Sequence, residues 1–207
     1  MKAKKIFVNA LTFSRLPLIF LWMAAAVAVE LRQADFWFGF WSLMAMGVCG
    51  FSDLFDGMLA RKWDVVSPLG KMADPLMDKV FFVVVFPTML WVVSHRGEQS
   101  HAIVMLLFTV LYMVRDLWVM FLRSVGTMYG ADVAAMPLGK IRTALSFVCA
   151  GWVYMYLIWG NLLGSALRGR WLASCYCFES LLMALTVLSA ITYTLAYLPY
   201  LKKALSR

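Results

Sequence analysis

Six long apolar segments dominate the chain and constrain its fold more than any other feature. Each is near the length of about 20 residues that a helix needs to cross the hydrocarbon core of a membrane. They lie at Leu11–Val29, Phe36–Ala60, Met72–Ser94, Ala102–Leu122, Ile141–Leu163 and Leu172–Leu198. Because backbone polar groups in lipid must be bonded internally, each segment is expected to be helical. The sequence therefore predicts an all-α integral membrane protein with six transmembrane helices.

Composition supports one membrane domain rather than a soluble protein with an anchor. Hydrophobic residues make up 63% of the 207 residues, whereas soluble domains contain about 45–50%. We find no hydrophilic stretch long enough to form a second domain. The expected organisation is a single domain over residues 1–207.

The positive charge is distributed in a way that predicts the orientation. The formal net charge is +8, but the basic residues lie near the ends of apolar segments. This placement suits anionic lipid headgroups or phosphorylated substrates better than nucleic acid. With a cytoplasmic N-terminus, fifteen basic residues fall on the cytoplasmic side, and four fall on the other: Arg32, Arg96, Arg168 and Arg170. Since basic residues favour the cytoplasmic side, both termini are predicted to be cytoplasmic.

Four carboxylates are concentrated between the second and third apolar segments, at the predicted cytoplasmic face. Asp53 and Asp56 are three residues apart, and Asp74 and Asp78 are four apart. Either spacing puts both side chains on one face of a helix. A predicted turn at residues 67–70 would bring the two helices together antiparallel. The two acidic pairs are then expected to converge on one pocket.

Such a pocket needs cations, because four carboxylates at a membrane edge repel one another. One or two Mg²⁺ or Mn²⁺ ions would remove this repulsion, and two ions suit a displacement at a diphosphate. Gly57 and Ala60 are small and leave room for a bulky ligand. Gly70 does the same or ends the turn, and Arg61 is suited to holding a phosphate.

The segment from Asp53 to Asp78 reads D-x2-D-G-x2-A-R-x8-G-x3-D-x3-D. It resembles the signature of the CDP-alcohol phosphatidyltransferases at every fixed position. The resemblance implies a six-helix membrane enzyme, typically homodimeric and dependent on Mg²⁺ or Mn²⁺. Such an enzyme transfers a phosphatidyl group from a CDP-linked lipid, usually CDP-diacylglycerol, to an alcohol and releases CMP.

The resemblance also implies roles for individual residues. Asp78 would be the catalytic base that accepts the proton of the acceptor hydroxyl. The metal ligands would be Asp53, Asp56, Asp74 and also Asp78. The CDP-binding residues would be Asp56, Gly57, Ala60, Arg61 and Gly70.

A second group of charged residues points to the acceptor. Arg115 and Arg123 are eight residues apart, about two helical turns, and so share a face. Lys140 and Arg142 open the fifth apolar segment. These four residues are the predicted site for a phosphate on the acceptor. The alternative is ordinary anchoring of basic residues at helix ends, although the deeper position of Arg115 in its apolar segment favours a functional role for this residue.

Three short patterns resemble the subgroup of the family that uses sn-glycerol 3-phosphate and forms phosphatidylglycerophosphate. They are Asn9-x-x-Thr12-x-x-Arg15, the Arg115-Asp116 pair followed by Arg123, and Gly139-Lys140-Ile141-Arg142-Thr143. The detailed resemblance covers residue 9 to about residue 143. Relatives with inositol phosphate, serine, choline or ethanolamine as acceptor remain alternatives. The expected location is the inner, cytoplasmic membrane of a bacterium.

Two readings without catalysis compete with the transferase. A divalent-cation transporter would explain acidic residues in a membrane, but it usually places them at the midplane in repeated halves. A non-catalytic scaffold leaves the carboxylates unexplained. His95 and His101 flank a loop on the opposite side and are expected at the surface. Glu179, within the last apolar segment, has no assigned role.

Overall fold

The computed structural model describes the backbone of residues 2–32, 36–63, 68–130 and 137–206. Within these ranges it describes all side chains except those of residues 2–6, 8–9, 51–57, 59–61 and 68–75. All structural statements below refer to this part of the chain.

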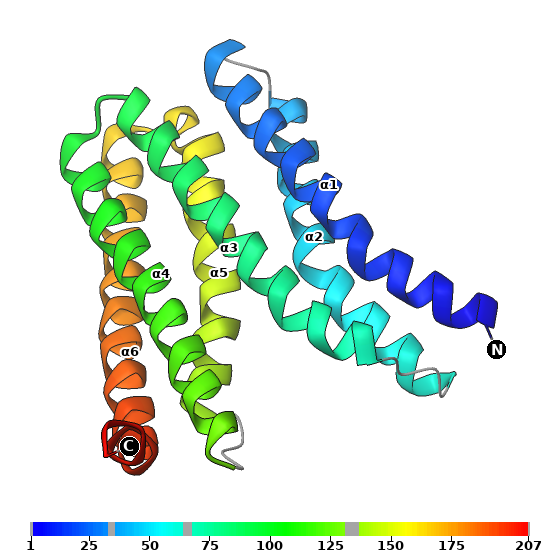
Figure 1. Cartoon of the computed structure of the whole chain (residues 1–207). Helices are drawn as coiled ribbons and strands as arrows, with labels where there is room; N and C mark the ends of the chain where they lie inside the picture. The colour runs from blue at the N-terminus through cyan, green and yellow to red at the C-terminus, as the bar shows by residue number, and fades with distance from the viewer. Residues whose placement is uncertain (1, 33–35, 64–67, 131–136, 207) are drawn as a thin grey trace.

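The described residues form six α-helices and one short 3₁₀ helix (Figure 1). Their bounds are α1 Lys2–Arg32, α2 Phe36–Lys62, α3 Pro68–His95, α4 Gln99–Met128, α5 Pro137–Trp159, η1 Gly160–Leu162 and α6 Ser165–Leu205. Five predicted apolar segments each lie within one of these helices, and the fifth segment covers most of α5 and all of η1 and ends one residue beyond η1, so the helical class is confirmed. The 41 residues of α6 correspond to about 60 Å of helix, which is roughly twice the thickness of a hydrocarbon core.

Five helices are long and apolar enough to cross a membrane, namely α1, α3, α4, α5 with η1, and α6. The apolar stretch found in α2, Phe36–Gly50, is shorter than a span, but the side chains that follow it are outside the described part. Many large apolar side chains are exposed, including Leu21, Trp41 and Leu117. A soluble protein would not leave so much apolar helix surface in water. The chain is an integral membrane protein.

The helices form two groups that α3 connects (Figure 1). In one group, α1 packs against both α2 and α3; in the other, α6 packs against α4 and α5. The second half of α3 packs on α4, whereas its first half leans away with α1 and α2 (Figure 1). The acidic segment therefore begins in one group and ends on the helix that reaches the other.

Local sequence explains where α3 ends and where it begins. Gly97, between α3 and α4, has φ +73°, a conformation that residues with a Cβ rarely adopt. The Gly97 N–H donates a hydrogen bond to the Ser94 carbonyl at 3.0 Å, and the Glu98 N–H donates one to the Val93 carbonyl at 3.3 Å. These two bonds form a Schellman motif. The predicted turn at residues 67–70 is wrong for residues 68–70, because α3 begins at Pro68. Proline favours the first helical position, where its missing N–H costs nothing.

An aromatic core joins the two groups near the middle of the molecule. Phe82 and Phe86 of α3 pack against Phe108 and Tyr112 of α4, with 4.7 Å between the ring centroids of Phe86 and Phe108. Phe147 of α5 closes the cluster, 4.6 Å from Phe82. One ring of this core, that of Tyr112, lies beneath the guanidinium of Arg142, so the core contacts the basic residues described next.

Candidate active site

The backbone puts the four aspartates of the acidic segment on two helices. Asp53 and Asp56 lie in the second half of α2, and Asp74 and Asp78 lie in the first half of α3. Because both segments are continuously helical, each pair lies on one helical face, as its spacing predicts. The side chains of seven predicted site residues are outside the described part: Asp53, Asp56, Gly57, Ala60, Arg61, Gly70 and Asp74. Their roles stay predictions.

Asp78, the predicted base, is described and has a buried cation beside it. The Nη1 atom of Arg15, on α1, lies 3.9 Å from Oδ1 of Asp78. The Arg15 side chain is 3% exposed, whereas that of Asp78 is 33% exposed. The carboxylate is thus held from one side and remains accessible from another. Sequence reasoning gave Arg15 no role in the site, although it belongs to the opening pattern that resembles the glycerol 3-phosphate subgroup.

The donor chemistry of the acidic set fits a divalent metal. Four carboxylates supply only hard oxygen ligands, which Mg²⁺ and Mn²⁺ prefer. Among the described side chains no group of three or more His, Cys, Asp or Glu residues forms a metal site. Asp78 is the one predicted ligand whose side chain is described. Its side chain is 33% exposed.

Lys79 lies next to the acidic segment and near the basic residues. It follows Asp78 directly on α3 and is within electrostatic range of Asp116, Arg115, Arg123 and Arg142. The predicted base and three of the predicted acceptor residues, Arg115, Arg123 and Arg142, therefore belong to one region of the molecule, where α3 meets α4 and α5.

Asp116 organises two of the predicted acceptor residues. Its Oδ1 atom accepts a hydrogen bond from Nη1 of Arg115 at 2.9 Å and from Nη2 of Arg142 at 2.5 Å. The Arg142 guanidinium also lies over the ring of Tyr112, 4.1 Å from the centroid, an arrangement that attracts a cation. Both arginines are buried. One carboxylate thus holds two guanidinium groups from α4 and α5 together.

The arginines of this cluster have more positive charge and more hydrogen-bond donors than the described residues around them satisfy. The Nε and Nη1 atoms of Arg142 and the Nε atom of Arg115 are buried without a hydrogen-bond partner in the described part of the chain. Asp116 provides one negative charge for these two arginines. Unsatisfied buried donors on a cation are costly, and an anion with several oxygens would satisfy them.

The remaining two predicted acceptor residues differ in their placement. Arg123 lies two turns after Arg115 and reaches the ring of Tyr193 on α6, with its Cζ atom 5.5 Å from the centroid. Lys140 is exposed at the start of α5 and takes part in none of the contacts among Arg115, Asp116 and Arg142. The structure therefore brings three of the four predicted residues together.

Two residues of α6 complete the basic region, and sequence reasoning missed both. Ser189 accepts a hydrogen bond from Nη2 of Arg115, and the Tyr193 hydroxyl accepts one from Nη2 of Arg123 at 3.1 Å. Their spacing of four residues puts them on one face of α6. The sequence contains one weak signal for these two residues, which is a polar residue and a tyrosine four residues apart in an apolar segment.

The expectation that His101 is a surface residue is wrong. Its Nε2 atom lies 3.0 Å from Oε1 of Glu179, and neither side chain is exposed to solvent. His101 opens α4 about 21 Å along the helix axis before Arg115, so this pair lies far from the basic residues. It joins α4 to α6 and gives Glu179 a structural role.

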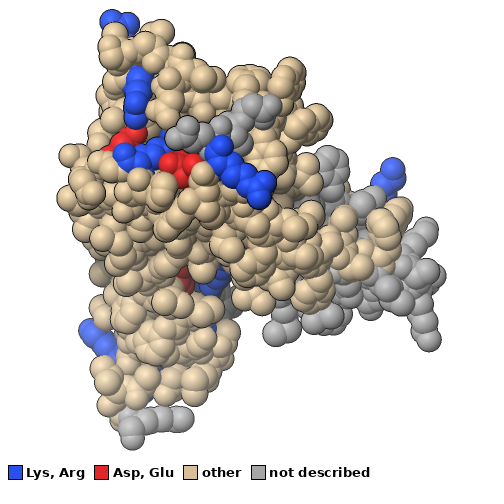
Figure 2. Space-filling model, turned by 90° about the horizontal axis from the view of Figure 1, so that it is seen from above, with Lys and Arg blue, Asp and Glu red and all other residues tan. Residues whose placement is uncertain are grey.

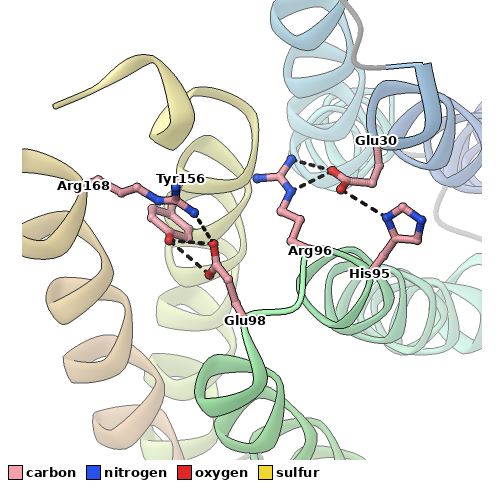
Figure 3. Close-up of polar contacts among 6 residues, drawn as sticks. All are labelled: Glu30, His95, Arg96, Glu98, Tyr156 and Arg168. Carbon is pink, nitrogen blue, oxygen red and sulfur yellow. Dashed lines mark hydrogen bonds and ion pairs between the residues drawn. The ribbon is translucent and has the colours of Figure 1, made fainter. Parts of the chain in front are cut away.

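Two further ion-pair clusters lie at the end of the molecule where α3 turns into α4 (Figure 3). The Arg96 side chain donates to Glu30 of α1 at 2.6 and 2.7 Å, and His95 reaches the same carboxylate at 3.4 Å. Glu98 accepts from Arg168 at 2.6 Å and from Tyr156 at 3.1 Å. Acidic and basic side chains accordingly lie side by side on this largely uncharged face (Figure 2).

Sequence comparisons agree with the signature in the acidic segment. Residues 5–192 match the model of the family described as CDP-alcohol phosphatidyltransferase. This match continues through α5 and most of α6, well past the region of detailed resemblance that ends near residue 143.

Several curated proteins are similar to parts of the chain. A cardiolipin synthase (CMP-forming) from Streptomyces coelicolor is 34% identical over 40% of this chain and 38% of its own length. A CDP-diacylglycerol–glycerol-3-phosphate 3-phosphatidyltransferase from Mycoplasma genitalium is 31% identical over 65% of this chain and 50% of its own. The Escherichia coli K12 protein of the same name is 28% identical over 63% and 70%. The match spans half or less of the first two relatives. With a family match over most of its length, the chain belongs to the CDP-alcohol phosphatidyltransferase family.

Proposed function

We propose that this protein transfers the phosphatidyl group of CDP-diacylglycerol to sn-glycerol 3-phosphate, giving phosphatidylglycerophosphate and CMP. Family membership supports the transfer from a CDP-linked lipid. Relatives named for glycerol 3-phosphate support the acceptor, while the one named cardiolipin synthase makes the acceptor the point to test.

Asp78 is the proposed catalytic base. It removes the proton from the attacking hydroxyl group of the acceptor, whose oxygen then forms a bond to the phosphatidyl phosphorus. The bond from that phosphorus to the bridging oxygen breaks, and CMP leaves with the electron pair. Arg15 holds the Asp78 carboxylate from the buried side. Bound Mg²⁺ or Mn²⁺, held by Asp53, Asp56, Asp74 and Asp78, would neutralise the charge of the diphosphate. Gly57, Ala60, Arg61 and Gly70 are proposed to line the CDP site with Asp56.

The observation that carries the acceptor assignment is the set of unsatisfied guanidinium donors of Arg115 and Arg142. A phosphate on the acceptor offers several charged oxygens to such donors, in the planar geometry that arginine favours. Serine, choline or ethanolamine would bring no anionic phosphate to them. Arg123 and Lys140 are proposed to add charge at the rim of the same site.

We further infer that α2 completes a set of six membrane crossings and that the site faces the cytoplasm of a bacterium, with both termini on that side. The bias of basic residues supports this orientation. A homodimer is expected from the family resemblance. The mass of the purified protein in detergent, corrected for bound detergent, tests it, and a monomer at working concentrations would contradict it.

An acceptor panel tests the proposed reaction. The purified protein is supplied with CDP-diacylglycerol and Mg²⁺ or Mn²⁺, and with glycerol 3-phosphate, phosphatidylglycerol, inositol phosphate, serine, choline or ethanolamine. We expect CMP release and phosphatidylglycerophosphate formation only with glycerol 3-phosphate, and neither in the presence of a chelator. Product lipids are identified by mass spectrometry, so that cardiolipin or another lipid would be recognised and would reject the acceptor.

Two comparisons make the panel decisive. The Arg142→Gln variant should lose affinity for glycerol 3-phosphate, while Arg170→Gln should not, because Arg170 is an exposed arginine near the start of α6. Divalent-cation flux into liposomes without CMP release would favour a transporter instead.

A further inference from the structure

The last helix contributes a tyrosine that contacts two of the predicted acceptor arginines. The Cζ atom of Arg115 lies 5.1 Å from the ring centroid of Tyr193, and that of Arg123 lies 5.5 Å from it. The Tyr193 hydroxyl also accepts a hydrogen bond from Arg123. One ring of α6 thus interacts with two cations of α4.

These contacts counteract the repulsion between Arg115 and Arg123. Arg115 and Arg123 carry like charges on one face of α4, with their backbones about 12 Å apart along the axis. Without a counter-group, the flexible side chains would spread apart to reduce repulsion. An aromatic ring attracts cations to its electron-rich face, so Tyr193 can hold both guanidinium groups at a defined separation.

Tyr193 is itself rigidly placed. It is 2% exposed and packs with Val119 and Leu122 of α4. The Tyr197 ring stacks on it at 6.5 Å, with an interplanar angle of 13°. A side chain held in this way retains its position when a ligand is absent, which lowers the entropic cost of binding.

Ser189 and Gly139 also contact this group of residues. Ser189, one turn before Tyr193, accepts a hydrogen bond from the Arg115 guanidinium. Gly139, at the start of α5, lies so close that an added Cβ would be 3.2 Å from the Tyr193 hydroxyl and 3.6 Å from Nη2 of Arg115. A methyl group at residue 139 would therefore press on the Tyr193 hydroxyl, whereas its distance from Arg115 would be an ordinary contact.

We propose that Tyr193, assisted by Ser189, is a positioning residue that fixes the separation of Arg115 and Arg123 and so sets the affinity for a phosphorylated acceptor. This inference rests on the proposed function, because it assigns the two arginines to the acceptor phosphate. It makes α6 part of the acceptor site rather than only a membrane anchor.

Steady-state kinetics of the full-length protein with glycerol 3-phosphate and CDP-diacylglycerol test this role. Tyr193→Phe removes the hydrogen bond to Arg123 and keeps the ring; we expect KM for glycerol 3-phosphate to rise about threefold to tenfold. Tyr193→Leu also removes the ring, and we expect a further rise of roughly fivefold. KM for CDP-diacylglycerol and kcat should change less than about twofold, since the hydroxyl and ring are not expected to touch the reacting atoms.

Tyr197→Phe is the matched control, since it changes the same chemical group one turn later on α6 and keeps the ring stacked on Tyr193. It should leave both KM values unchanged. Proportional rises in both KM values for Tyr193→Phe, or an unchanged KM for glycerol 3-phosphate in Tyr193→Leu, would overturn the inference. If the wild-type protein does not use glycerol 3-phosphate at all, the proposed function fails before this comparison begins.

A double substitution separates positioning from general damage. Gly139→Ala alone should raise KM for glycerol 3-phosphate because the new methyl group presses on the Tyr193 hydroxyl. In the Tyr193→Phe background that hydroxyl is absent, so Gly139→Ala should add little. In the Tyr197→Phe background it should have its full effect. Equal effects of Gly139→Ala in all backgrounds would contradict a steric link through Tyr193.

Discussion

At the scale of single residues, the molecule treats its buried charges in two different ways. Near Asp116 the arginines outnumber the carboxylate, and guanidinium donors of Arg115 and Arg142 are left without a partner in the described part. At the other end of α4, the two ring nitrogens of His101 lie 3.0 Å from the Glu179 carboxylate and 3.5 Å from the Glu98 carboxylate. The first arrangement has an excess of positive charge and favours binding of an anion, whereas in the second the histidine already faces carboxylates of the chain itself, which favours a structural role.

The pair of His101 and Glu179 gives a stability prediction. His101→Leu leaves the Glu179 carboxylate buried without its partner, which should cost about 3–5 kcal/mol in the free energy of unfolding. The double variant His101→Leu with Glu179→Leu removes both polar groups, so it should be more stable than His101→Leu alone. Thermal unfolding in detergent measures the difference.

His95→Leu is the control for this prediction. The His95 side chain is 48% exposed, and an exposed pair contributes about 1 kcal/mol or less. Moreover, Arg96 still holds Glu30 when His95 is replaced. If the double variant lost as much stability as His101→Leu and Glu179→Leu lose together when each is made alone, His101 and Glu179 would act independently.

At the scale of helices, the sequence predicted the elements better than their contacts. Apolar length alone predicted all six helices, because lipid allows few other backbone conformations. It did not predict that Pro68 starts a helix rather than a turn, since proline favours both positions. Nor did it predict the burial of His101, because its partner Glu179 is 78 residues away and a histidine near a helix end is usually exposed.

The same limit applies to the candidate site. The spacing of Arg115 and Arg123 predicted a shared face on α4, and contacts of both with Tyr193 agree with it. The contribution of α6 had no comparable signal, since Ser189 and Tyr193 lie more than 65 residues from the arginines they bind. A short sequence pattern gives information about one helix only, whereas these contacts involve residues of α4, α5 and α6.

At the scale of the whole molecule, the ion pairs that connect the helices and the residues of the candidate site lie in different places. Ion pairs at the α3–α4 connection tie this connection to α1, α5 and α6 (Figure 3). The acidic and basic residues of the candidate site lie toward the other ends of these helices. The residues of these ion pairs and the described residues of the candidate site therefore do not overlap.

The proposed orientation can be checked directly on the intact protein. Reporter domains that are active only in the cytoplasm, fused separately to the N-terminus and to the C-terminus, should both be active. A reporter inserted after Gly97, between α3 and α4, should be inactive. Activity at one terminus only would contradict six crossings, and activity at residue 97 would reverse the orientation.

The central claim is that Asp78 and the basic residues beside it form one transferase site. The most direct test is the rate of CMP release from CDP-diacylglycerol, with Mg²⁺ and glycerol 3-phosphate, for the wild-type protein and for Asp78→Asn. A positioned base contributes about 10²–10⁴ in rate, so we predict at least a hundredfold loss in a variant that purifies and unfolds like the wild type. CMP release by Asp78→Asn at the wild-type rate would contradict the claim.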